Sequence, residues 1–561
     1  MCRLFFQGNS SEVIQKPMHQ NQRKKAATPT VAANPLPART TDVPFIIAVS
    51  AVVLAGLVRL RLLSIPLERD EGGFAYIGRH LFSGHLYTDL FDNKLPGLYS
   101  LYAVFCRLFG YGPGGIHFGL LICNLASIWL IYKLFGSVFN NWVGAVSASV
   151  FALTSLSPNV NGFAAHANQL LMPFAIGGLL MLQKGIATQR IRHIAVAGLL
   201  LGVAFTIKQQ VVTYGVFAGV WLLLECIRKR QAVGETIRQL AVFSIGAIVP
   251  FGLVCLYFMA VGRFNDLWTW TVELPAQLGS STIMGDRWNI FKTYFSGVLE
   301  HFEVTWLVAV LGWFVLFFGK YDSASKVFGW LFPLFCAASI AIGVSYYPHY
   351  FVLCLPAVAL LAGVLVDTIR TRLPENSGNK IAIGLVVLLA LIPVAQNASY
   401  YFQPDFVKIH RKCYDMNPFP ELQQVGKELG RRSKPGDKIG VLGSEPEIMV
   451  YANRESATGH LFLYNLLSQG PKSPELQQQY LDDLKKNQPA YLVWVTSTGS
   501  WATDYYRTDF FTNTRPIVEG YTLCGKAEAF EDGRPGVVVW DNAALQYKFQ
   551  GNYQIYIYKK R

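Results

Sequence analysis

Charged residues are scarce in this 561-residue chain. Asp, Glu, Lys and Arg make up only 15% of the sequence, whereas hydrophobic residues make up 52%. An ordinary soluble enzyme of this length carries more charge and fewer apolar residues. The composition therefore excludes a soluble globular enzyme and indicates an integral membrane protein.

Motifs for nucleotide and metal chemistry are also missing. The sequence has no glycine-rich phosphate loop ending in Gly-Lys-Ser/Thr, no dinucleotide fingerprint and no metalloprotease helix. Its nine cysteines show no metal-ligand spacing, and most lie in apolar runs, where a thiol acts as a small hydrophobe. Only Cys413 and Cys524 fall in a polar C-terminal region, where they could form a disulfide if that region is exported.

Eleven apolar runs are about long enough to cross a bilayer, the shortest only marginally. They lie near residues 45–63, 114–135, 142–157, 168–183, 194–207, 211–227, 239–261, 302–318, 328–344, 349–367 and 381–398. Residues 1–44 lack apolar periodicity and are predicted to form a disordered, basic, cytoplasmic tail. The predicted membrane domain covers residues 45–403.

The loops between these runs give a topology. A net charge of +14 would suggest a nucleic-acid partner in a soluble chain, but here much of it lies in short loops, so we predict none. The basic clusters, predicted to be cytoplasmic, are Lys184/Arg190/Arg192, Arg228/Lys229/Arg230/Arg238, Lys320/Lys326 and Arg370/Arg372/Lys380. Alternation then places the loops near 158–167, 208–210, 262–301 and 345–348 outside.

Residues 95–110 test this topology. If they crossed the membrane, every later loop would change sides and the basic clusters would face outward. We therefore predict an interfacial helix that starts at Pro96 and whose apolar repeat is interrupted by Arg107. The first external loop then covers residues 64–113.

After about residue 403 the composition becomes that of a soluble domain. Predicted strands at 438–443, 491–496, 536–540 and 553–558 alternate with predicted helices at 419–432 and 474–486. We predict an extracytoplasmic α/β domain over residues 404–561.

Charges concentrate in the external loop between Arg69 and Gly97. Asp70 and Glu71 precede a helical pattern, so they could cap the helix, and a capped carboxylate also stays ionised and can act as a base. Asp92 and Lys94 fall in an ordinary turn sequence, but Lys94 at the membrane edge could meet a phosphate.

Further polar residues lie at the predicted outer ends of the apolar runs. They are His166, Gln169, Lys208, His349 and Tyr350. Each alone is typical of a residue at the membrane interface. All fall on the external side without having been used to derive the topology, so we predict that they converge on one site.

Taken in order, these motifs resemble the bacterial GT-C glycosyltransferases, relatives of the protein mannosyltransferases and of the aminoarabinose transferase that acts on lipid A. The motifs are Asp70-Glu71-Gly72-Gly73, Asp92-Asn93-Lys94 with Pro96-Gly97, Lys208-Gln209-Gln210, His349-Tyr350-Phe351 and Gly443-Ser444-Glu445-Pro446-Glu447.

The resemblance implies a polytopic α-helical membrane protein of GT-C type with a C-terminal extracytoplasmic α/β domain, in the bacterial inner membrane. It implies an inverting hexosyl- or pentosyltransferase. Such an enzyme moves a sugar from a polyprenyl-phosphate donor to an envelope lipid, glycan or protein, as in lipopolysaccharide or protein glycosylation.

The resemblance also implies roles for individual residues. The position matching Asp70, with Glu71 beside it, supplies the proposed base, and the position matching Lys94 approaches the donor phosphate. We expect Arg79, Lys208 and His349 to help at the phosphate, and Asp92, His166, Gln169 and Tyr350 to bind substrate.

Two alternatives remain open at this point. The family often carries an acidic residue in the second external loop, where this chain has Asn168-Gln169. No metal site is therefore predicted, although a divalent cation would be compatible with the family. A multi-pass transporter or flippase of lipid-linked sugars is the rival function, but transporters usually place charges near the midplane between repeated halves.

Overall fold

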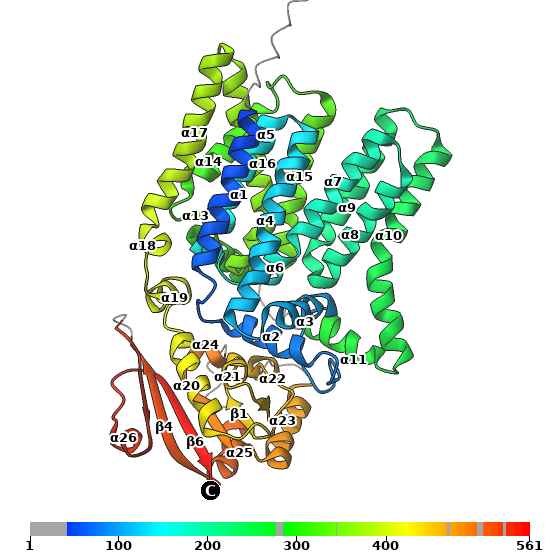
Figure 1. The fold of residues 1–561 in the computed structure, drawn as a ribbon. Helices are drawn as coiled ribbons and strands as arrows, with labels where there is room; N and C mark the ends of the chain where they lie inside the picture. The colour runs from blue at the N-terminus through cyan, green and yellow to red at the C-terminus, as the bar shows by residue number, and fades with distance from the viewer. Residues whose placement is uncertain (1–41, 277–283, 344, 468–471, 502–508, 531–533) are drawn as a thin grey trace, which may run out of the picture. The chain divides into compact units, whose positions relative to one another are not determined.

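A computed structural model describes residues 42–561 except 277–283, 344, 468–471, 502–508 and 531–533. The predicted tail over residues 1–44 lies almost entirely outside the described residues. The rest of the chain consists of a bundle of long helices and a mixed sheet flanked by shorter helices (Figure 1). This arrangement confirms the predicted fold class.

Each of the eleven apolar runs forms a helix within the described part of the chain. The helices are α1 (Val43–Arg61), α4 (Pro113–Val138), α5 (Asn141–Ser155), α7 (Met172–Thr188), α8 (Ile191–Ile207), α9 (Val212–Arg228), α10 (Val233–Ala260), α14 (Glu303–Val315), α15 (Ser323–Ile342), α16 (Leu355–Thr371) and α17 (Glu375–Gln396).

Not all of these helices reach the length of a span. Among the described residues, seven helical segments are long and apolar enough to cross a membrane. The count becomes eight if α13 (Met284–Leu299) and α14, bent by 104° at the break between them, form one span. The chain is therefore an integral multi-pass membrane protein. The predicted number of eleven counted α5, α8, α14 and α16, which are shorter than 18 residues.

Glycines allow some of the short helices to pack closely. Gly312 of α14 lies against the Leu361 carbonyl of α16, and Gly363 of α16 lies against the Val143 carbonyl of α5. Small residues let helix backbones approach where lipid provides no hydrophobic driving force between helices. Most residues of α16 are consequently buried.

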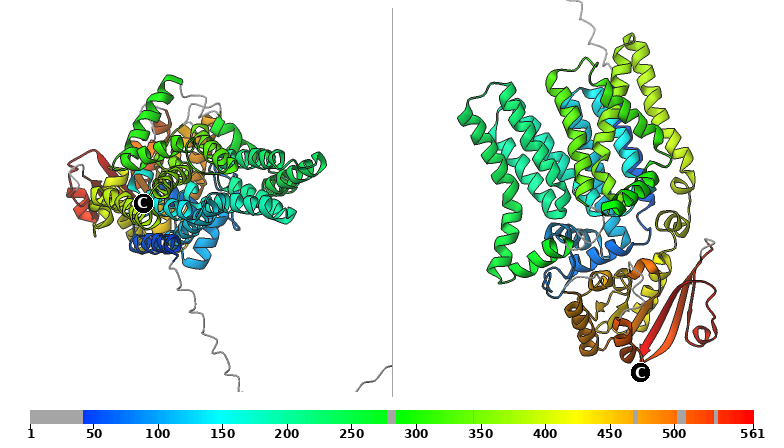
Figure 2. Two further views of the ribbon diagram at one scale, coloured as in Figure 1. Left: turned by 90° about the horizontal axis from the view of Figure 1, so that it is seen from above. Right: turned by 180° about the vertical axis from the view of Figure 1, so that it is seen from behind.

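The helices α2 (Arg69–His80) and α3 (Pro96–Phe109) lie across the ends of the long helices, between them and the sheet (Figure 2). Pro96 occupies the first turn of α3, where a missing amide hydrogen has no effect on the helix. Leu98, Tyr99, Tyr102 and Phe105 form its buried face. With 14 residues, α3 is too short to span, in agreement with the topology predicted from the basic loops.

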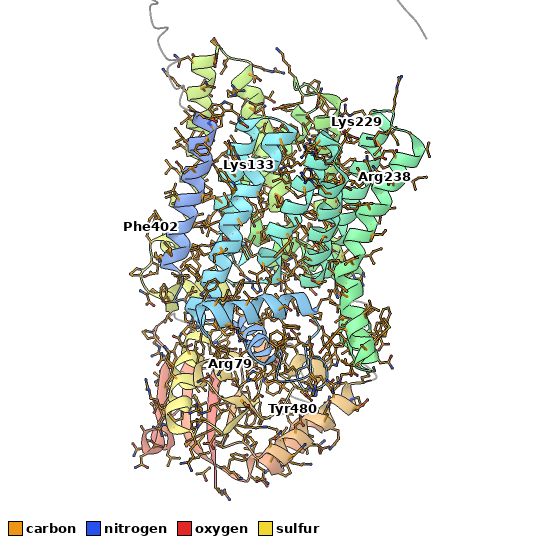
Figure 3. The ribbon with its side chains drawn as sticks, turned by 45° about the vertical axis from the view of Figure 1, so that its right-hand side comes forward. Arg79, Lys133, Lys229, Arg238, Phe402 and Tyr480 are labelled. Carbon is orange, nitrogen blue, oxygen red and sulfur yellow. The ribbon has the colours of Figure 1, made fainter. Side chains whose placement is uncertain are left out.

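Figure 3 shows the two ends of the bundle. Lys229 and Arg238 lie at one end of the long helices, and Arg79 lies at the other, near α2 and α3. Basic loop residues and the predicted external loop are thus separated by the length of the helices. This is the separation that the positive-inside rule requires.

The C-terminal region contains a six-stranded sheet of order β2-β1-β3-β6-β4-β5. Strand β1 is parallel to β2 and β3, and the remaining neighbours are antiparallel. The strands are β1 (Lys438–Leu442), β2 (Glu455–Ser456), β3 (Tyr491–Val495), β4 (Tyr521–Ala529), β5 (Val537–Trp540) and β6 (Tyr553–Lys560).

Helices accompany this sheet along the chain. They are α18 (Ala398–Tyr401), α19 (Phe406–Tyr414), α20 (Phe419–Arg432), α21 (Glu447–Ala452), α22 (Leu463–Leu467), α23 (Ser473–Asn487), α24 (Thr498–Trp501), α25 (Asp509–Val518) and α26 (Asp541–Gln546). All four predicted strands and both predicted helices are present. The prediction missed β2 and β4. Cys413 and Cys524 are both free thiols, so no disulfide joins them.

Short elements line the end of the bundle that faces the sheet. They are η1 (Pro158–Val160), α6 (Ala167–Leu170), η2 (Gln209–Val211), α11 (Phe264–Trp268), η3 (Thr269–Glu273) and η4 (Pro348–Leu353). These elements carry Gln169, His349 and Tyr350, and His166 and Lys208 immediately precede α6 and η2.

Cysteine labelling tests the position of α3. We expect cysteines introduced at Ser83 and Gly114, both exposed, to react with a membrane-impermeant maleimide from the same side, because α3 between them does not cross. A cysteine at the exposed Gln189, in the turn between α7 and α8, should react only from the opposite side. The measurement uses oriented vesicles and a background without native cysteines. Labelling of Ser83 and Gly114 from opposite sides would contradict the topology.

Candidate active site

The chain enters α2 through a turn of acidic residues. Glu68 is the N-cap: its carboxylate accepts a hydrogen bond from the Glu71 amide at 2.8 Å, and the Glu71 carboxylate accepts one from the Glu68 amide at 3.3 Å. This reciprocal capping box satisfies two amides that a helix start leaves free. The capping fixes the first turn of α2, on which Asp70 lies.

Glu71 is fully buried. Its Oε1 lies 3.0 Å from His117 Nε2 and accepts a hydrogen bond from the Ala165 amide at 2.6 Å. Burial alone would raise the pKa of Glu71, but His117 and the amide outweigh it and hold the pKa below its usual value. We predicted Glu71 as a catalytic residue beside Asp70. The structure instead gives it an architectural role, since it is 0% exposed and its oxygens already have protein partners.

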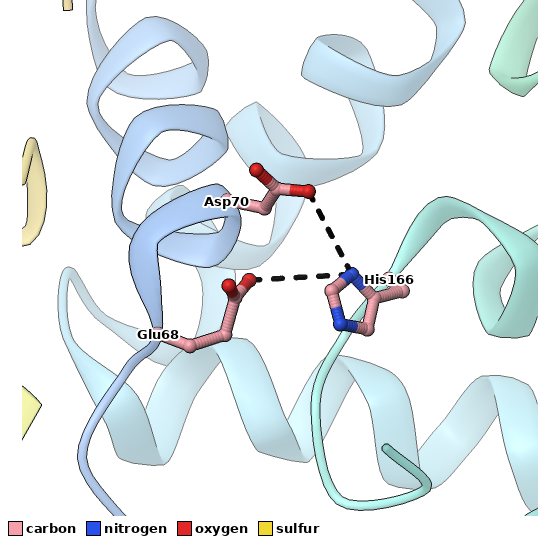
Figure 4. Close-up of side chains that lie close together, drawn as sticks. All are labelled: Glu68, Asp70 and His166. Atoms are coloured by element: carbon pink, nitrogen blue, oxygen red, sulfur yellow. Dashed lines mark ion pairs between the residues drawn. The ribbon is translucent and has the colours of Figure 1, made fainter. Parts of the chain in front are cut away.

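Asp70 differs from its neighbour in exposure. Its side chain is 26% exposed, and its Oδ2 lies 4.0 Å from His166 Nδ1, which is also 4.0 Å from Glu68 Oε1 (Figure 4). Within the described residues, no side chain donates a hydrogen bond to the Asp70 carboxylate. Asp70 can therefore accept a proton from a group that enters the site.

Two pairs of side chains extend the site beyond Asp70. The ring of His166 stacks on that of His349 with 4.0 Å between centroids. Lys208 Nζ lies 4.0 Å above the ring of Tyr350 and donates a hydrogen bond to Asn168 Oδ1 at 2.8 Å. Four of the predicted residues, from the ends of different helices, thus come together as the sequence predicted.

Lys94 approaches the same group from the external loop. The pKa of Lys208 lies well below its usual value, because burial disfavours the ammonium and the charge of Lys94 adds to this, while Asp70 opposes it. Burial also lowers the pKa of His349 well below normal, with contributions from His166 and both lysines. The site thus crowds basic groups into a poorly solvated space. An anion that entered would stabilise their charged forms.

Asp92 supports the position of Lys94. Asp92 is fully buried, accepts hydrogen bonds from Tyr99 Oη at 2.8 Å and from the Asn93 amide at 2.7 Å, and lies 3.6 Å from Lys94 Nζ. Tyr87 Oη donates to the Lys94 carbonyl at 2.6 Å. We expected Asp92 to bind substrate, but its burial leaves it holding the turn that carries Lys94.

The structure does not bring the side chains of Arg79 and Gln169 to the basic residues around Asp70. Arg79 donates to Asn453 Oδ1 at 2.5 Å and lies 4.2 Å above the ring of Tyr111. Gln169 is buried and donates to the Ser155 carbonyl at 2.8 Å. Arg79 is at the far end of α2 from Asp70, and its partner belongs to the C-terminal domain.

Sequence reasoning missed several residues of the site. Glu68 could have been found from its spacing to Glu71, which is that of a capping box. His117 lies within an apolar run and Tyr414 in a polar region, and neither has a local signal. Tyr414 Oη is 3.3 Å from His166 Nε2.

Tyr464 is another residue near the site that was not predicted. The pKa of Tyr464 lies well above normal because of burial and the nearby charge of Asp70.

Glu68, Asp70 and His166 form a group that could hold a metal ion. One ligand atom from each lies within 4.8 Å of the others. Carboxylate oxygen and imidazole nitrogen suit Mn²⁺ or Zn²⁺. Burial and the charges of Asp70 and Glu71 raise the pKa of Glu68 well above its usual value, so a cation would have to displace a proton there. In ligand type the group fits a divalent cation.

A protein-family model matches part of the chain. The family model of dolichyl-phosphate-mannose-protein mannosyltransferases matches residues 94–254. The matched segment begins at Lys94 and includes His166 and Lys208. No curated protein matches the chain in sequence.

Solved structures show the same fold. ArnT from Cupriavidus metallidurans bound to undecaprenyl phosphate superposes with a TM-score of 0.55 at 14% identity, covering 92% of this chain and 97% of that one. ArnT from the same organism in the apo state gives 0.50 at 16% identity, covering 90% and 99%. The oligosaccharyltransferase AglB from Archaeoglobus fulgidus gives 0.49 at 10% identity, covering 90% and 75%. The two ArnT superpositions confirm the predicted fold.

Removing the Glu71 side chain should destabilise the protein. In Glu71→Ala, His117 and the Ala165 amide lose a buried partner, so we expect the free energy of unfolding to fall by about 3–5 kcal/mol. Denaturant unfolding in detergent measures this. The matched control is Glu519→Ala, which breaks the exposed pair with Arg515 and should cost about 0–1 kcal/mol. Equal effects of the two substitutions would contradict the architectural role of Glu71.

Proposed function

Because the chain has the fold of the GT-C glycosyltransferases and matches a mannosyltransferase family model over residues 94–254, we propose that it is a membrane glycosyltransferase. Its donor is a sugar linked to polyprenyl phosphate, and its acceptor is an envelope lipid, glycan or protein. The binding of undecaprenyl phosphate by ArnT, a protein of the same fold, supports this class of donor.

One observation carries the proposal. A partly exposed carboxylate, Asp70, lies in the same group as Lys94 and Lys208 at the end of the helix bundle. This reaction needs a base that takes the proton of the acceptor and a cationic group that stabilises the anionic leaving group. A donor whose hydrocarbon tail lay among the long helices would bring its phosphate to this end of the bundle.

The reaction then proceeds by direct displacement. The acceptor hydroxyl or amine gives its proton to Asp70 and attacks the anomeric carbon of the sugar. The bond from that carbon to the phosphate oxygen breaks, and polyprenyl phosphate leaves with the electron pair. A single displacement inverts the anomeric configuration, for a hexose or a pentose alike.

The positive groups of the site act on the leaving phosphate. Lys94 lies at the exposed side of the group and Lys208 at its buried side, over Tyr350. A phosphate between them would raise the pKa of Lys208 and restore its charge. His349 contributes a further donor. A divalent cation held by Glu68, Asp70 and His166 would, when bound, add positive charge beside this phosphate.

The location of the site determines on which side of the membrane the reaction takes place. The basic loops at the opposite end of the bundle favour a cytoplasmic position for that end. The site and the C-terminal domain are then extracytoplasmic, at the bacterial inner membrane. A flippase of lipid-linked sugars is the less favoured alternative, because the described charged residues of the site cluster at one end of the helices rather than at their middle.

Asp70→Asn tests the base. We expect it to insert normally and to lose about 10²–10⁴-fold in the rate at which purified protein releases polyprenyl phosphate from a labelled lipid-linked sugar with envelope acceptor present. Asp89→Asn in the same loop, an exposed partner of His85, is the control with unchanged rate. Near wild-type transfer by Asp70→Asn would refute the assignment.

A second experiment tests for a metal ion. If the wild-type protein loses transfer when a chelator is added and regains it with Mn²⁺, the reaction requires a divalent cation.

Lys94→Ala tests the phosphate contact. We expect kcat/KM for the lipid donor to fall about 10²-fold, since one well-placed donor to developing charge is removed. Steady-state kinetics at varied donor concentration measure it. The exposed Lys485 gives a control, Lys485→Ala, with unchanged kinetics. Unchanged saturation by the donor in Lys94→Ala would remove Lys94 from the phosphate site.

A further inference from the structure

The C-terminal domain contacts the loop that carries Asp70 at several points between Leu67 and Phe91. The Leu67 amide donates to Tyr451 Oη at 2.6 Å, and Tyr76 Oη accepts from the Ser456 amide at 2.9 Å. Farther along the loop, the Phe91 amide donates to the Gly459 carbonyl at 3.1 Å. A domain that only recruited a partner would not need these bonds.

Arg69 makes the contact next to the proposed base. Its Nε donates to the Ser444 carbonyl at 2.7 Å, and its Nη2 lies 3.0 Å from Glu445 Oε1. Its guanidinium also lies 5.6 Å from the ring centre of Phe419. The Arg69 side chain is only 15% exposed, so water screens its ion pair with Glu445 only weakly. The residue that precedes Asp70 is thus tied to the C-terminal domain.

Glu445 is held in turn by its own domain. It is fully buried, and its Oε2 accepts a hydrogen bond from Ser500 Oγ at 2.8 Å. The same hydroxyl accepts from the Ser444 amide at 3.0 Å. Ser444, Glu445 and Ser500 therefore form a rigid cradle for the Arg69 guanidinium, built from the Gly443–Glu447 motif and α24.

Backbone packing reinforces this contact two residues beyond Asp70. A Cβ atom added at Gly72 would lie 2.5 Å from the Glu447 amide nitrogen, so α2 and α21 touch through a glycine. Gly73 likewise lies directly against the ring of Phe462. The first turns of α2 therefore have no space in which to shift toward the C-terminal domain.

We propose that Arg69 and Glu445 are positioning residues through which the C-terminal domain sets the place of Asp70. This inference rests on the proposed function of Asp70. The first turn of α2 is held on one side by Glu71, against His117 and the Ala165 amide, and on the other by Arg69 in its cradle. Asp70, whose own side chain has no such anchor, takes its position from these two neighbours.

Loss of the cradle would act on catalysis more than on donor binding. Without Glu445, the Arg69 guanidinium lacks its ion-pair partner, and the first turn of α2 loses one of the anchors that set the place of Asp70. A displacement of about 1 Å of a reacting group costs about 10²-fold in rate. Lys94 and Lys208, which lie outside this turn, keep their contacts with the donor.

Glu445→Ala, Glu445→Gln and Ser500→Ala test the proposal in the full-length protein. We expect kcat to fall about 10²-fold in Glu445→Ala with donor KM within about twofold. Glu445→Gln, which keeps an oxygen for Arg69, should recover much of the rate. Ser500→Ala should lower kcat by a smaller factor. It replaces Glu445→Ala as the test if Glu445→Ala does not fold. Arg431→Ala, which breaks an exposed pair in the same domain, is the control with unchanged rate.

Two further readouts separate positioning from general stability. Amide hydrogen exchange over residues 69–78 should rise in Glu445→Ala while exchange in α4 stays constant. In an Asp70→Asn background, Glu445→Ala should cause no further loss of rate, because the two residues act through one step. Unchanged kcat and unchanged exchange in Glu445→Ala would overturn the proposal. If the wild type shows no transfer, the proposed function fails, and hydrogen exchange still decides whether Glu445 holds α2.

Discussion

The rest of the site depends on one buried turn, Glu68 to Glu71, where the external loop becomes helix α2. Glu71 is an acid inside the protein, and such a group is stable there only with several donors. His117 and the Ala165 amide supply them from two other segments of the membrane domain. The same contacts that stabilise Glu71 therefore fix the position of the helix that carries Asp70.

The second constraint is the concentration of basic groups in poorly solvated space. Lys94, Lys208, His166 and His349 come from four segments, and burial disfavours the charged forms of the last three. In the absence of an anion such a group is costly, and a phosphate relieves the cost. Tyr464 of the C-terminal domain lies near Asp70, so that domain also borders the site.

Much of this organisation was predictable from the sequence, because it follows from local signals. Basic loops gave a topology in which α3 does not span, and strand periodicity located four of the six strands. Strand β4 was missed because Gly525, Lys526 and Glu528 interrupt its apolar pattern, which also contains a bulge between Leu523 and Gly525. The contact that holds Glu71 could not be predicted, since its partner His117 is 46 residues away in the chain. Arg79 was assigned to the phosphate for its charge alone, whereas its partner Asn453 is 374 residues away.

We propose that a lipid phosphate binds between Lys94 and Lys208 beside Asp70. An experimental structure of the protein with polyprenyl phosphate bound tests it most directly. We expect phosphate oxygens within about 3 Å of both ammonium groups, the distance of a charge-assisted hydrogen bond, with the prenyl chain running among the long helices. A phosphate bound away from both lysines, with the Asp70 carboxylate facing no part of the ligand, would contradict it.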